Sequence, residues 1–318
     1  MPNLKAQIIE NLTFLKNYTK KKGEKFKPIA YGRAIMGIRS LPGPITSPQQ
    51  VKGVRGVGKR IYAKVEELFQ TGKISAVEEA KKEERGTRTK KEKAIDSMTQ
   101  VWGVGPSLAE RLYTQGIRSI SDMQKHKKQL PRNVRIGLKY RRDIATPISR
   151  DFAQAFEVLV EHVLTEEFGW GSFDMEFAGS YRRGLRTLND IDCLLSSTTF
   201  TLQNAVDALI RWGVVFETLS CKTKKFMGIA GCPSGYGHPF RFDIEFVKPN
   251  EWWTALLYFT GSQANNVAMR ETAKRQGYLL NQSGLFRVTG KTKRRIPIHS
   301  ERDVFRELGL PYLSPEDR

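Results

Sequence analysis

The sequence predicts a multi-domain α plus α/β protein, with a helical, basic first half and a mixed α/β second half. Residues 1–150 contain 33 Lys and Arg against 13 Asp and Glu, and residues 151–318 contain 20 of each, so the first half carries the whole net charge of +20 (33 − 13 = 20). In that half two glycine turns each open an amphipathic helical pattern. Alternation typical of strands begins only in the second half.

Size, charge and cysteine content exclude several classes of protein. The 318 residues can build two or three hydrophobic cores, and no apolar run approaches the roughly 20 residues that span a bilayer. The N-terminus lacks a secretory pattern, and the three cysteines lack metal-ligand spacing. We therefore expect a reducing intracellular location, nuclear or cytoplasmic, with a viral setting also open. The localised positive charge predicts a polyanionic partner, most simply nucleic acid.

The first half opens with a helical pattern and then repeats one plan twice. Apolar residues at Leu4, Ile8, Ile9, Leu12 and Leu15 predict an N-terminal helix. Further on, "VKGVRGVGKRIYAKVEELFQTG" and "TQVWGVGPSLAERLYTQG" each place an apolar residue before a Gly-x-Gly turn and a helix. Such turns let the backbone approach a phosphate and present the free N–H groups of a helix start. The turn glycines are Gly56 and Gly58 in the first copy and Gly103 and Gly105 in the second.

The second half contains a helix and three strands. Residues 151–168 show helical spacing of apolar residues, and alternation predicts strands over 173–177, 190–195 and 240–247. Because residues two apart on a strand share a face, Asp190 and Asp192 point together while Ile191 and Cys193 face the core. On the strand 240–247, Asp243 shares its polar face with Arg241 and Glu245, opposite three apolar side chains.

Two carboxylates on one strand face repel each other and favour a cation between them. Mg²⁺ binds carboxylates together with substrate phosphates, and paired ions suit phosphoryl transfer. The turn "GSYRRG" places Ser180 and Arg183 just before these acids, where a triphosphate would lie beside its metals. The alternative is that Asp190 and Asp192 mark a solvated strand edge.

These stretches together resemble a known enzyme family. The chain is similar over nearly its whole length to the family X DNA polymerases of the beta and lambda type, without a BRCT domain. The resemblance rests on both glycine turns, which resemble helix-hairpin-helix motifs, on "GSYRRG" with "NDIDCLL", and on "RIGLKY", "KFMGIA", "FRFDIEFVKP", "LLYFTGS" and "ERDVFRELGLPYLSPEDR". It implies a nucleotidyltransferase palm with a mixed sheet and a small α/β C-terminal subdomain.

The resemblance assigns roles to residues of the catalytic half. Asp190, Asp192 and Asp243 would be the catalytic ligands of two Mg²⁺ ions, with Mn²⁺ as a substitute. A triphosphate and its nucleotide would contact Ser180, Arg183, Tyr258, Phe259, Gly261, Asn266 and Arg270. Tyr258 and Phe259 would lie under the incoming sugar and disfavour a ribose 2′-hydroxyl. The family pattern is broken at Pro147, Asn189 and Glu245, near the positions expected to bind nucleotide and metal, although all three catalytic aspartates are present.

The resemblance also implies a second chemistry in the first domain. Lys64 matches the family's Schiff-base lysine, which removes a 5′-deoxyribose phosphate, although a plain phosphate contact is the alternative. Lys27, Tyr31 and Arg60 match or nearly match residues around a DNA 5′-phosphate. The glycine turns would grip DNA backbones, with a monovalent cation as a further expected ligand.

We therefore expect a helical 5′-phosphate-binding or lyase domain (1–85), a charged linker (86–94), a helical duplex-binding subdomain (95–148), a palm (149–260) and a nucleotide-selecting subdomain (261–318). The predicted function is that of a monomeric DNA-directed DNA polymerase that fills short gaps in repair. Its partners would be gapped or nicked duplex DNA with a 5′-phosphate, and dNTPs. Two alternatives stay open: a template-independent or ribonucleotide-tolerant transferase, and a gap-binding or lyase protein with weak polymerase activity.

Overall fold

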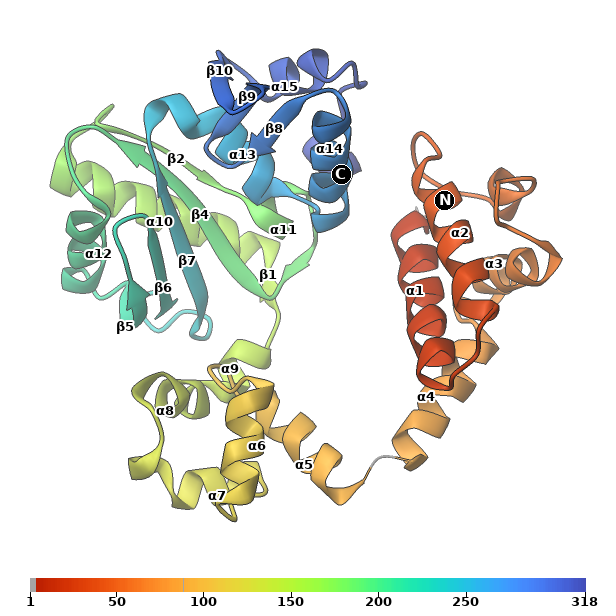
Figure 1. Ribbon diagram of the computed structural model, residues 1–318. Coiled ribbons are helices and arrows are strands. Elements are labelled where there is room, and N and C mark those ends of the chain that lie inside the picture. The colour runs from red at the N-terminus through yellow and green to blue at the C-terminus, as the bar shows by residue number, and fades with distance from the viewer. Residues whose placement is uncertain (1–3, 88) are drawn as a thin grey trace. The chain divides into compact units, whose positions relative to one another are not determined.

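The computed structural model describes residues 4–87 and 89–318. The chain divides into two compact units, Met1–Ala94 and Ile95–Arg318. Figure 1 labels their elements. No helix within the described residues is both long and apolar enough to cross a membrane.

The first unit is helical, as predicted. It contains α1 (Lys5–Lys21), α2 (Lys27–Arg39), the short 3₁₀ helix η1 (Pro48–Val51), α3 (Lys59–Thr71) and α4 (Ser75–Thr87). Ile8, Leu12 and Leu15 on α1 are buried, which confirms the N-terminal helical pattern. They share one core with Tyr31 of α2 and Val65 of α3.

The charged stretch that we interpret as a linker is mostly helical. The helix α4 continues to Thr87, and α5 (Lys90–Thr99) begins shortly after it and crosses the boundary between the two units. Arg88 lies outside the described residues. The reason is that this stretch is rich in Lys, Glu and Ala, which are strong helix formers even where no apolar face is buried.

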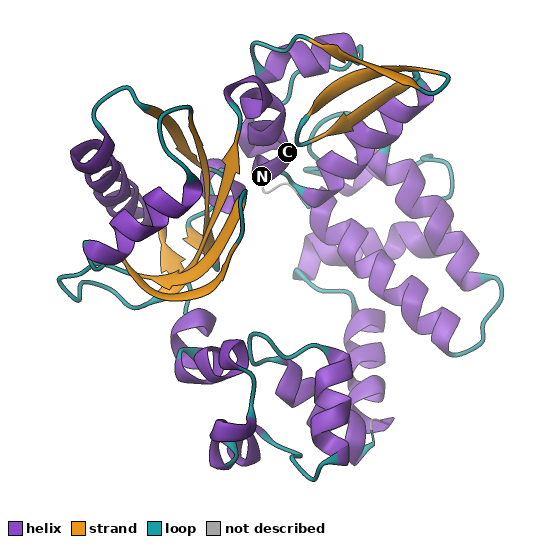
Figure 2. Cartoon of the chain, turned by 60° about the vertical axis from the view of Figure 1, so that its left-hand side comes forward, coloured by secondary structure: helices purple, strands orange, loops and turns teal. Residues whose placement is uncertain are grey.

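The second unit begins with a helical subdomain. Its elements after α5 are α6 (Pro106–Thr114), α7 (Ile120–Lys125), η2 (Lys127–Gln129), α8 (Arg132–Lys139) and α9 (Arg141–Ala145). Their apolar faces form a separate core around Met98, Val101, Leu112 and Val134. Figure 2 shows that helices and loops make up this region without any strand.

The two glycine turns have the same local geometry. The first glycine of each adopts a left-handed backbone, with φ of +94° at Gly56 and +89° at Gly103. The second glycine, Gly58 or Gly105, is the extended N-cap residue of the following helix, α3 or α6. A side chain at Gly56 would also collide with the backbone of Arg33. The repeat seen in the sequence is therefore a repeat of structure.

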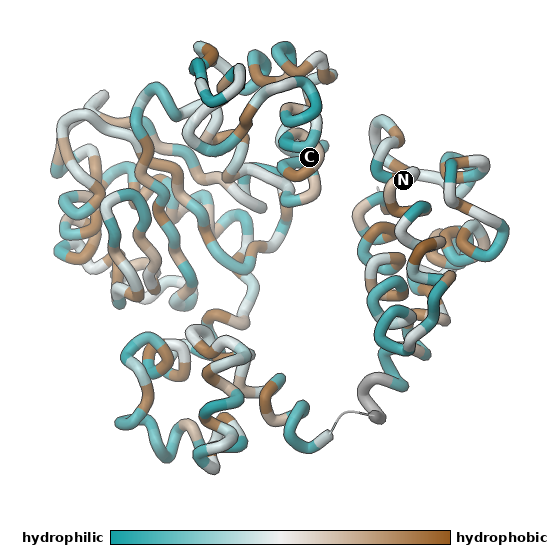
Figure 3. The backbone as a smooth tube through the Cα atoms, in the orientation of Figure 1, coloured by the Kyte–Doolittle hydropathy of each residue, from teal (hydrophilic) through white to brown (hydrophobic). Residues whose placement is uncertain are grey.

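A five-stranded mixed sheet follows, with strand order β2-β4-β7-β6-β5. Its strands are β2 (Phe173–Phe177), β4 (Asp190–Ser197), β5 (Val215–Cys221), β6 (Lys225–Ala230) and β7 (Phe240–Val247). Only β4 and β7 pair in parallel. Hydrophobic residues, brown in Figure 3, run along these strands. The mixed sheet predicted for the second half is confirmed.

Helices cover the two faces of this sheet differently. The helices α10 (Arg150–Phe168) and α12 (Leu202–Arg211) pack on one face, where Phe156, Ile191 and Phe242 lie in the largest core. On the other face, α13 (Trp252–Thr260) packs against Leu194 of β4 and Val247 of β7. The polar ends of β4 and β7 therefore emerge on the α13 side.

The C-terminal part is a small α/β subdomain. It contains α14 (Gln263–Arg275), an antiparallel sheet of β8 (Tyr278–Asn281), β9 (Gly284–Thr289) and β10 (Thr292–Ile296), then α15 (Glu301–Glu307). Its core centres on Met269, Leu280, Leu285 and Phe305. The remaining short elements are β1 (Ile148–Ser149), which pairs with β3 (Thr187–Leu188), and α11 (Gly179–Arg182), η3 (Pro249–Glu251) and η4 (Pro315–Asp317).

Candidate active site

Three aspartates meet where β4 and β7 run side by side. The register pairs Asp192 directly with Asp243, and Asp190 with Arg241. Asp190 and Asp192 share a strand face, and Ile191 between them is fully buried, as the alternation predicts. Asp190 and Arg241 are 51 positions apart in the sequence (241 − 190 = 51), and this parallel pairing places them side by side. The structure thus brings together the three acids singled out in the sequence.

The electrostatics of this cluster favour a cation. Burial, reinforced by the charges of Asp190 and Asp243, raises the pKa of Asp192 to about 7. Burial and the charge of Asp243 also raise the pKa of Asp190. Carboxylates that are buried against each other in this way gain most from hard divalent ions, whose preferred ligands are oxygens. The donor set therefore fits Mg²⁺ or Mn²⁺.

Arg241 is a neighbour whose role the sequence did not reveal. Its Nη2 donates a hydrogen bond to Oδ1 of Asp243 over 2.5 Å, and its guanidinium lies 4.9 Å from the ring centre of Trp102. Although the strand register brings the three aspartates near one another, no three Asp, Glu, His or Cys side chains within the described residues are already arranged to hold a metal ion together. The alternation placed Arg241 on the face of Asp243, but it could not show that the two side chains bond.

The turn before β4 lies against the acids. A Cβ atom at Gly179 would come within 2.4 Å of Oδ2 of Asp192, so only glycine fits there. Ser180 follows on α11 and is half-buried. Arg183 Nη1 donates to the carbonyl oxygen of Thr260 over 2.6 Å, and burial lowers the pKa of its guanidinium. This turn is thus held between β4 and the end of α13.

The predicted nucleotide-contact residues at the α13–α14 junction form one cluster. The rings of Tyr258 and Phe259 lie perpendicular with centres 4.9 Å apart. Asn266 Nδ2 donates to the carbonyl oxygen of Tyr258 over 2.7 Å, and the Arg270 guanidinium lies 4.6 Å from the Tyr258 ring centre. A Cβ atom at Gly261 would lie 3.2 Å from Nη1 of Arg183, which joins this cluster to the turn beside the acids.

The predicted first-domain site lies on α2 and α3. Arg60 and Lys64 stand one helical turn apart on α3, with Arg60 exposed and Lys64 half-buried. On α2, Lys27 is exposed and pairs with Glu24 over 2.8 Å, while Tyr31 is buried in the core that α3 shares. Burial raises the pKa of Tyr31. The assignment of these four residues to a 5′-phosphate site stays a prediction.

Comparison with known proteins follows the same division of the chain. Residues 3–74 match the helix-hairpin-helix domain model, and residues 96–145 match the fingers domain of DNA polymerase lambda. Residues 148–249 match the DNA polymerase beta palm, and residues 255–318 match the DNA polymerase beta thumb. The chain belongs to the family X DNA polymerases. Members of this family are nucleotidyltransferases that depend on divalent metal ions.

Individual relatives of this family X chain are distant in sequence. It is 28% identical to DNA polymerase lambda of Rattus norvegicus over 99% of the chain and 30% identical to DNA polymerase lambda of Arabidopsis thaliana over 100%. It is 26% identical to the DNA-directed DNA/RNA polymerase mu of Homo sapiens over 93% of the chain. The chain spans 56%, 62% and 65% of the lengths of these three relatives, respectively.

Proposed function

We propose that this chain is a DNA-directed DNA polymerase that adds a templated deoxynucleotide to a 3′-end in short gaps during DNA repair. The observation that carries the proposal is the register of β4 and β7, which sets Asp243 beside Asp192 and next to Asp190. Three carboxylates behind an Arg- and Ser-bearing turn form a site for a metal-bound triphosphate. The substrate would be gapped or nicked duplex DNA with a 5′-phosphate.

Each group of residues has a distinct task in this reaction. Asp190, Asp192 and Asp243 would hold the divalent ions, which when bound lower the pKa of the primer 3′-hydroxyl and neutralise charge on the phosphates. Ser180 and Arg183 would bind the triphosphate oxygens. Preorganised donors of this kind stabilise the charge that develops during transfer.

The choice of a templated reaction rests on two features. Only residues 231–239 connect β6 to β7, so no long loop is available from that connection to stand in for a template. Tyr258 and Phe259 present two rings, supported by Asn266 and Arg270, against the expected position of the incoming sugar. Both features disfavour a template-independent or ribonucleotide-tolerant transferase.

Filling of a one-nucleotide gap with a 5′-phosphate tests this proposal. We expect wild type with Mg²⁺ to add the complementary nucleotide and Asp192→Asn to lose this activity by several orders of magnitude. The matched control is Asp174→Asn, which changes an exposed aspartate of β2 in the same sheet and should leave the rate unchanged. Gap binding without extension by wild type would overturn the polymerase proposal and favour a gap-binding protein.

A second activity, 5′-deoxyribose-phosphate lyase, is proposed for the first unit. It is supported by the half-buried position of Lys64 on α3, one turn from Arg60. Nucleophilic catalysis requires the neutral amine, which condenses with the sugar aldehyde and releases water. Borohydride should trap wild type, but not Lys64→Ala, on DNA that bears this 5′-group. The exposed Lys73→Ala is the control, and equal trapping of Lys64→Ala would leave Lys64 a phosphate contact only.

A further inference from the structure

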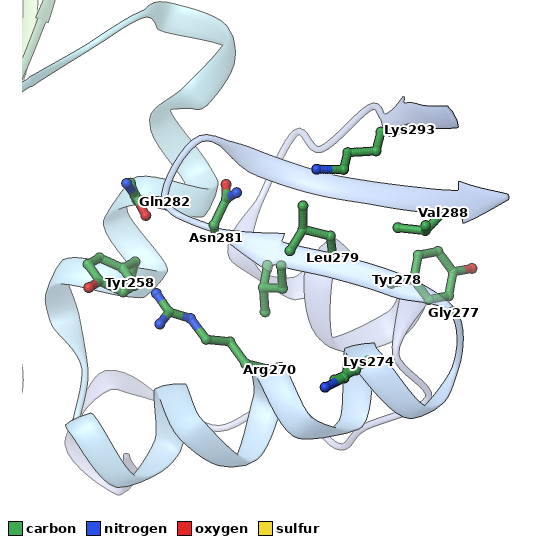
Figure 4. A pocket seen from close by; sticks show the side chains of 11 residues that line it. Tyr258, Arg270, Lys274, Gly277, Tyr278, Leu279, Asn281, Gln282, Val288 and Lys293 are labelled. Carbon is green, nitrogen blue, oxygen red and sulfur yellow. The ribbon is translucent and has the colours of Figure 1, made fainter. Parts of the chain in front are cut away.

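The C-terminal subdomain contains a groove most of which lies outside the proposed nucleotide site. It has a volume of about 830 Å³ and is lined by residues of α14, of β8 and of the sheet face turned away from the subdomain core, which we call the outer face (Figure 4). Arg270 and Lys274 approach it from the helix, and Lys293 approaches it from β10 on the opposite side. We call it the thumb groove. Its size is within the range of about 300–1,000 Å³ that is common for ligand sites.

The strand register explains why this face of the sheet is open. Leu279 pairs with Phe286, and Val288 pairs with Lys293, so these side chains share the outer face. The alternate residues, among them Leu280 and Leu285, point to the other face and fill the subdomain core. The outer face therefore contributes side chains to the groove and none to that core, and Tyr278 and Leu280 of the other face also line the groove.

The groove is strongly positive. Residues 274–295 contain seven Lys and Arg and no Asp or Glu, although the half of the chain in which they lie is neutral overall. No acidic side chain lines the groove. Within the residues that the structure describes, neither Lys274 nor Lys293 takes part in an ion pair. Two unneutralised ammonium groups on opposite walls point to an anionic ligand that passes between them.

The groove also offers flat surfaces between its cations. Tyr258 and Tyr278 line it, and Leu279 and Val288 add apolar area. Aromatic rings beside a positively charged track are the usual means by which proteins bind single-stranded nucleic acid, since bases stack on the rings while cations follow the phosphates. Asn281 adds an amide side chain to the lining.

The groove is continuous with the proposed nucleotide site. Tyr258 and Arg270, which belong to the cluster under the incoming nucleotide, also form one end of the groove, and Lys274 lies one helical turn further along α14. A strand that leaves the proposed nucleotide site beside Arg270 would enter the groove directly.

We propose that the thumb groove binds the single-stranded template beyond the templating base, with Lys274 and Lys293 on its phosphates. The inference rests on the proposed polymerase function. In a one-nucleotide gap the template returns to duplex at once and leaves no single strand for the groove. In a longer gap the unpaired template fills the groove. The groove therefore determines how the affinity for gapped DNA depends on gap length.

The test compares gaps of one and about six nucleotides, the latter within the usual site sizes for single strands. Lys274→Ala with Lys293→Ala should weaken binding of the longer gap about tenfold and binding of the shorter gap less than twofold. For the longer gap, the slope of log K against log salt concentration should become shallower by about 1.4, because two phosphate contacts to a single strand are lost. The measurements are fluorescence anisotropy and the rate of the first nucleotide addition.

The matched control removes two cations of the same segment that do not line the groove. Arg275 and Arg294 are exposed, and Arg294 lies on the opposite face of β10 from Lys293. Their double alanine variant should bind both gaps as wild type does. Equal losses on both gaps, or equal losses in the control, would overturn the proposal and leave a general electrostatic effect. One-nucleotide filling by wild type is a separate readout, so failure of the polymerase function is recognised independently.

Discussion

Arg241 and Asp243, two residues apart on β7, form a buried ion pair at the centre of the candidate active site, with Nη2 and Oδ1 2.5 Å apart. The Arg241 guanidinium also lies over the ring of Trp102, at the start of the second glycine turn. The pair supplies one positive charge to a group of three acids. It also connects the helical subdomain to the catalytic strand, since Trp102 precedes Gly103 of that turn.

Removing this charge should destabilise the protein in the absence of metal. Arg241→Met leaves Asp243 buried without its partner, and breaking a buried pair from one side typically costs about 3 kcal/mol or more. We expect the melting temperature to fall without Mg²⁺ and to recover in part when Mg²⁺ is added, more than wild type gains. Thermal unfolding with and without the ion measures both.

The control for this variant is Arg211→Met, which breaks the exposed pair with Glu167. Exposed pairs contribute about 0–1 kcal/mol, so this change should have little effect and no dependence on Mg²⁺. A loss of stability in Arg241→Met that Mg²⁺ leaves untouched would show that Arg241 does not balance the acids.

The sequence alone located the catalytic strands because alternation is a local property. Asp192 and Asp243 each sit between buried apolar neighbours, and Asp190 precedes the buried Ile191, so this pattern fixes which way each side chain points. The parallel pairing of β4 with β7 depends on contacts between residues about fifty positions apart, and no local pattern encodes it. The resemblance to a known family, rather than periodicity, joined the third aspartate to the first two.

The sequence could not predict which groups each side chain bonds to, because those partners are also far apart in the chain. The arginine pair Arg182–Arg183 was visible, but its two members have different tasks: Arg182 bonds Glu301, and Arg183 bonds the backbone of Thr260. The charged stretch 86–94 is interpreted as a linker or a helix end, and in the structure it contains the end of α4 and the start of α5. High charge is compatible with both states, and only the helix propensity of Lys, Glu and Ala favours the observed one.

Glu245, which departs from the family pattern, should protect the catalytic acids from Lys225. The two are cross-strand partners on β6 and β7 and form an ion pair, with Nζ and Oε1 2.5 Å apart. The charges of Asp243 and Asp192 also act on Lys225 and favour its charged form. Glu245→Gln should therefore free the ammonium to compete with metal and raise the Mg²⁺ concentration needed for half-maximal gap filling several-fold.

A double variant separates this effect from simple damage. Adding Lys225→Met to Glu245→Gln removes the competing charge and should return the Mg²⁺ requirement toward the wild-type value. Direct Mn²⁺ binding, followed by electron paramagnetic resonance, gives a readout that is independent of catalysis. If the double variant needs as much Mg²⁺ as Glu245→Gln alone, Lys225 is not the competitor.

Glu301 should make folding stability depend on pH. Burial alone would raise the pKa of this carboxyl, but hydrogen bonds from Arg318 and Arg182 outweigh it and hold the pKa below its usual value. A carboxyl with a lowered pKa in the folded state stabilises the protein above its unfolded pKa of about 4.3, and this contribution is lost as the pH falls through the folded value. Glu301→Gln should cost about 3 kcal/mol at pH 7.

Urea unfolding at several pH values checks this dependence. The difference in unfolding free energy between wild type and Glu301→Gln should shrink steadily below about pH 4.3, because wild type loses the contribution that the variant lacks. Glu307→Gln, on the same helix α15, is the control and should track wild type at every pH. A difference that stays constant with pH would mean that the variant disturbs packing rather than charge.

Tyr258 should set the selection of deoxyribose over ribose. Its ring is held perpendicular to Phe259 and beneath the Arg270 guanidinium, so its position is fixed on two sides. Tyr258→Ala opens space for a 2′-hydroxyl and should raise the ratio of kcat/KM for rNTP over dNTP about tenfold, a change of about 1.4 kcal/mol. Tyr278→Ala, in the same subdomain, should leave the ratio unchanged. An unaltered ratio in Tyr258→Ala would place sugar selection on the backbone near Gly261 instead.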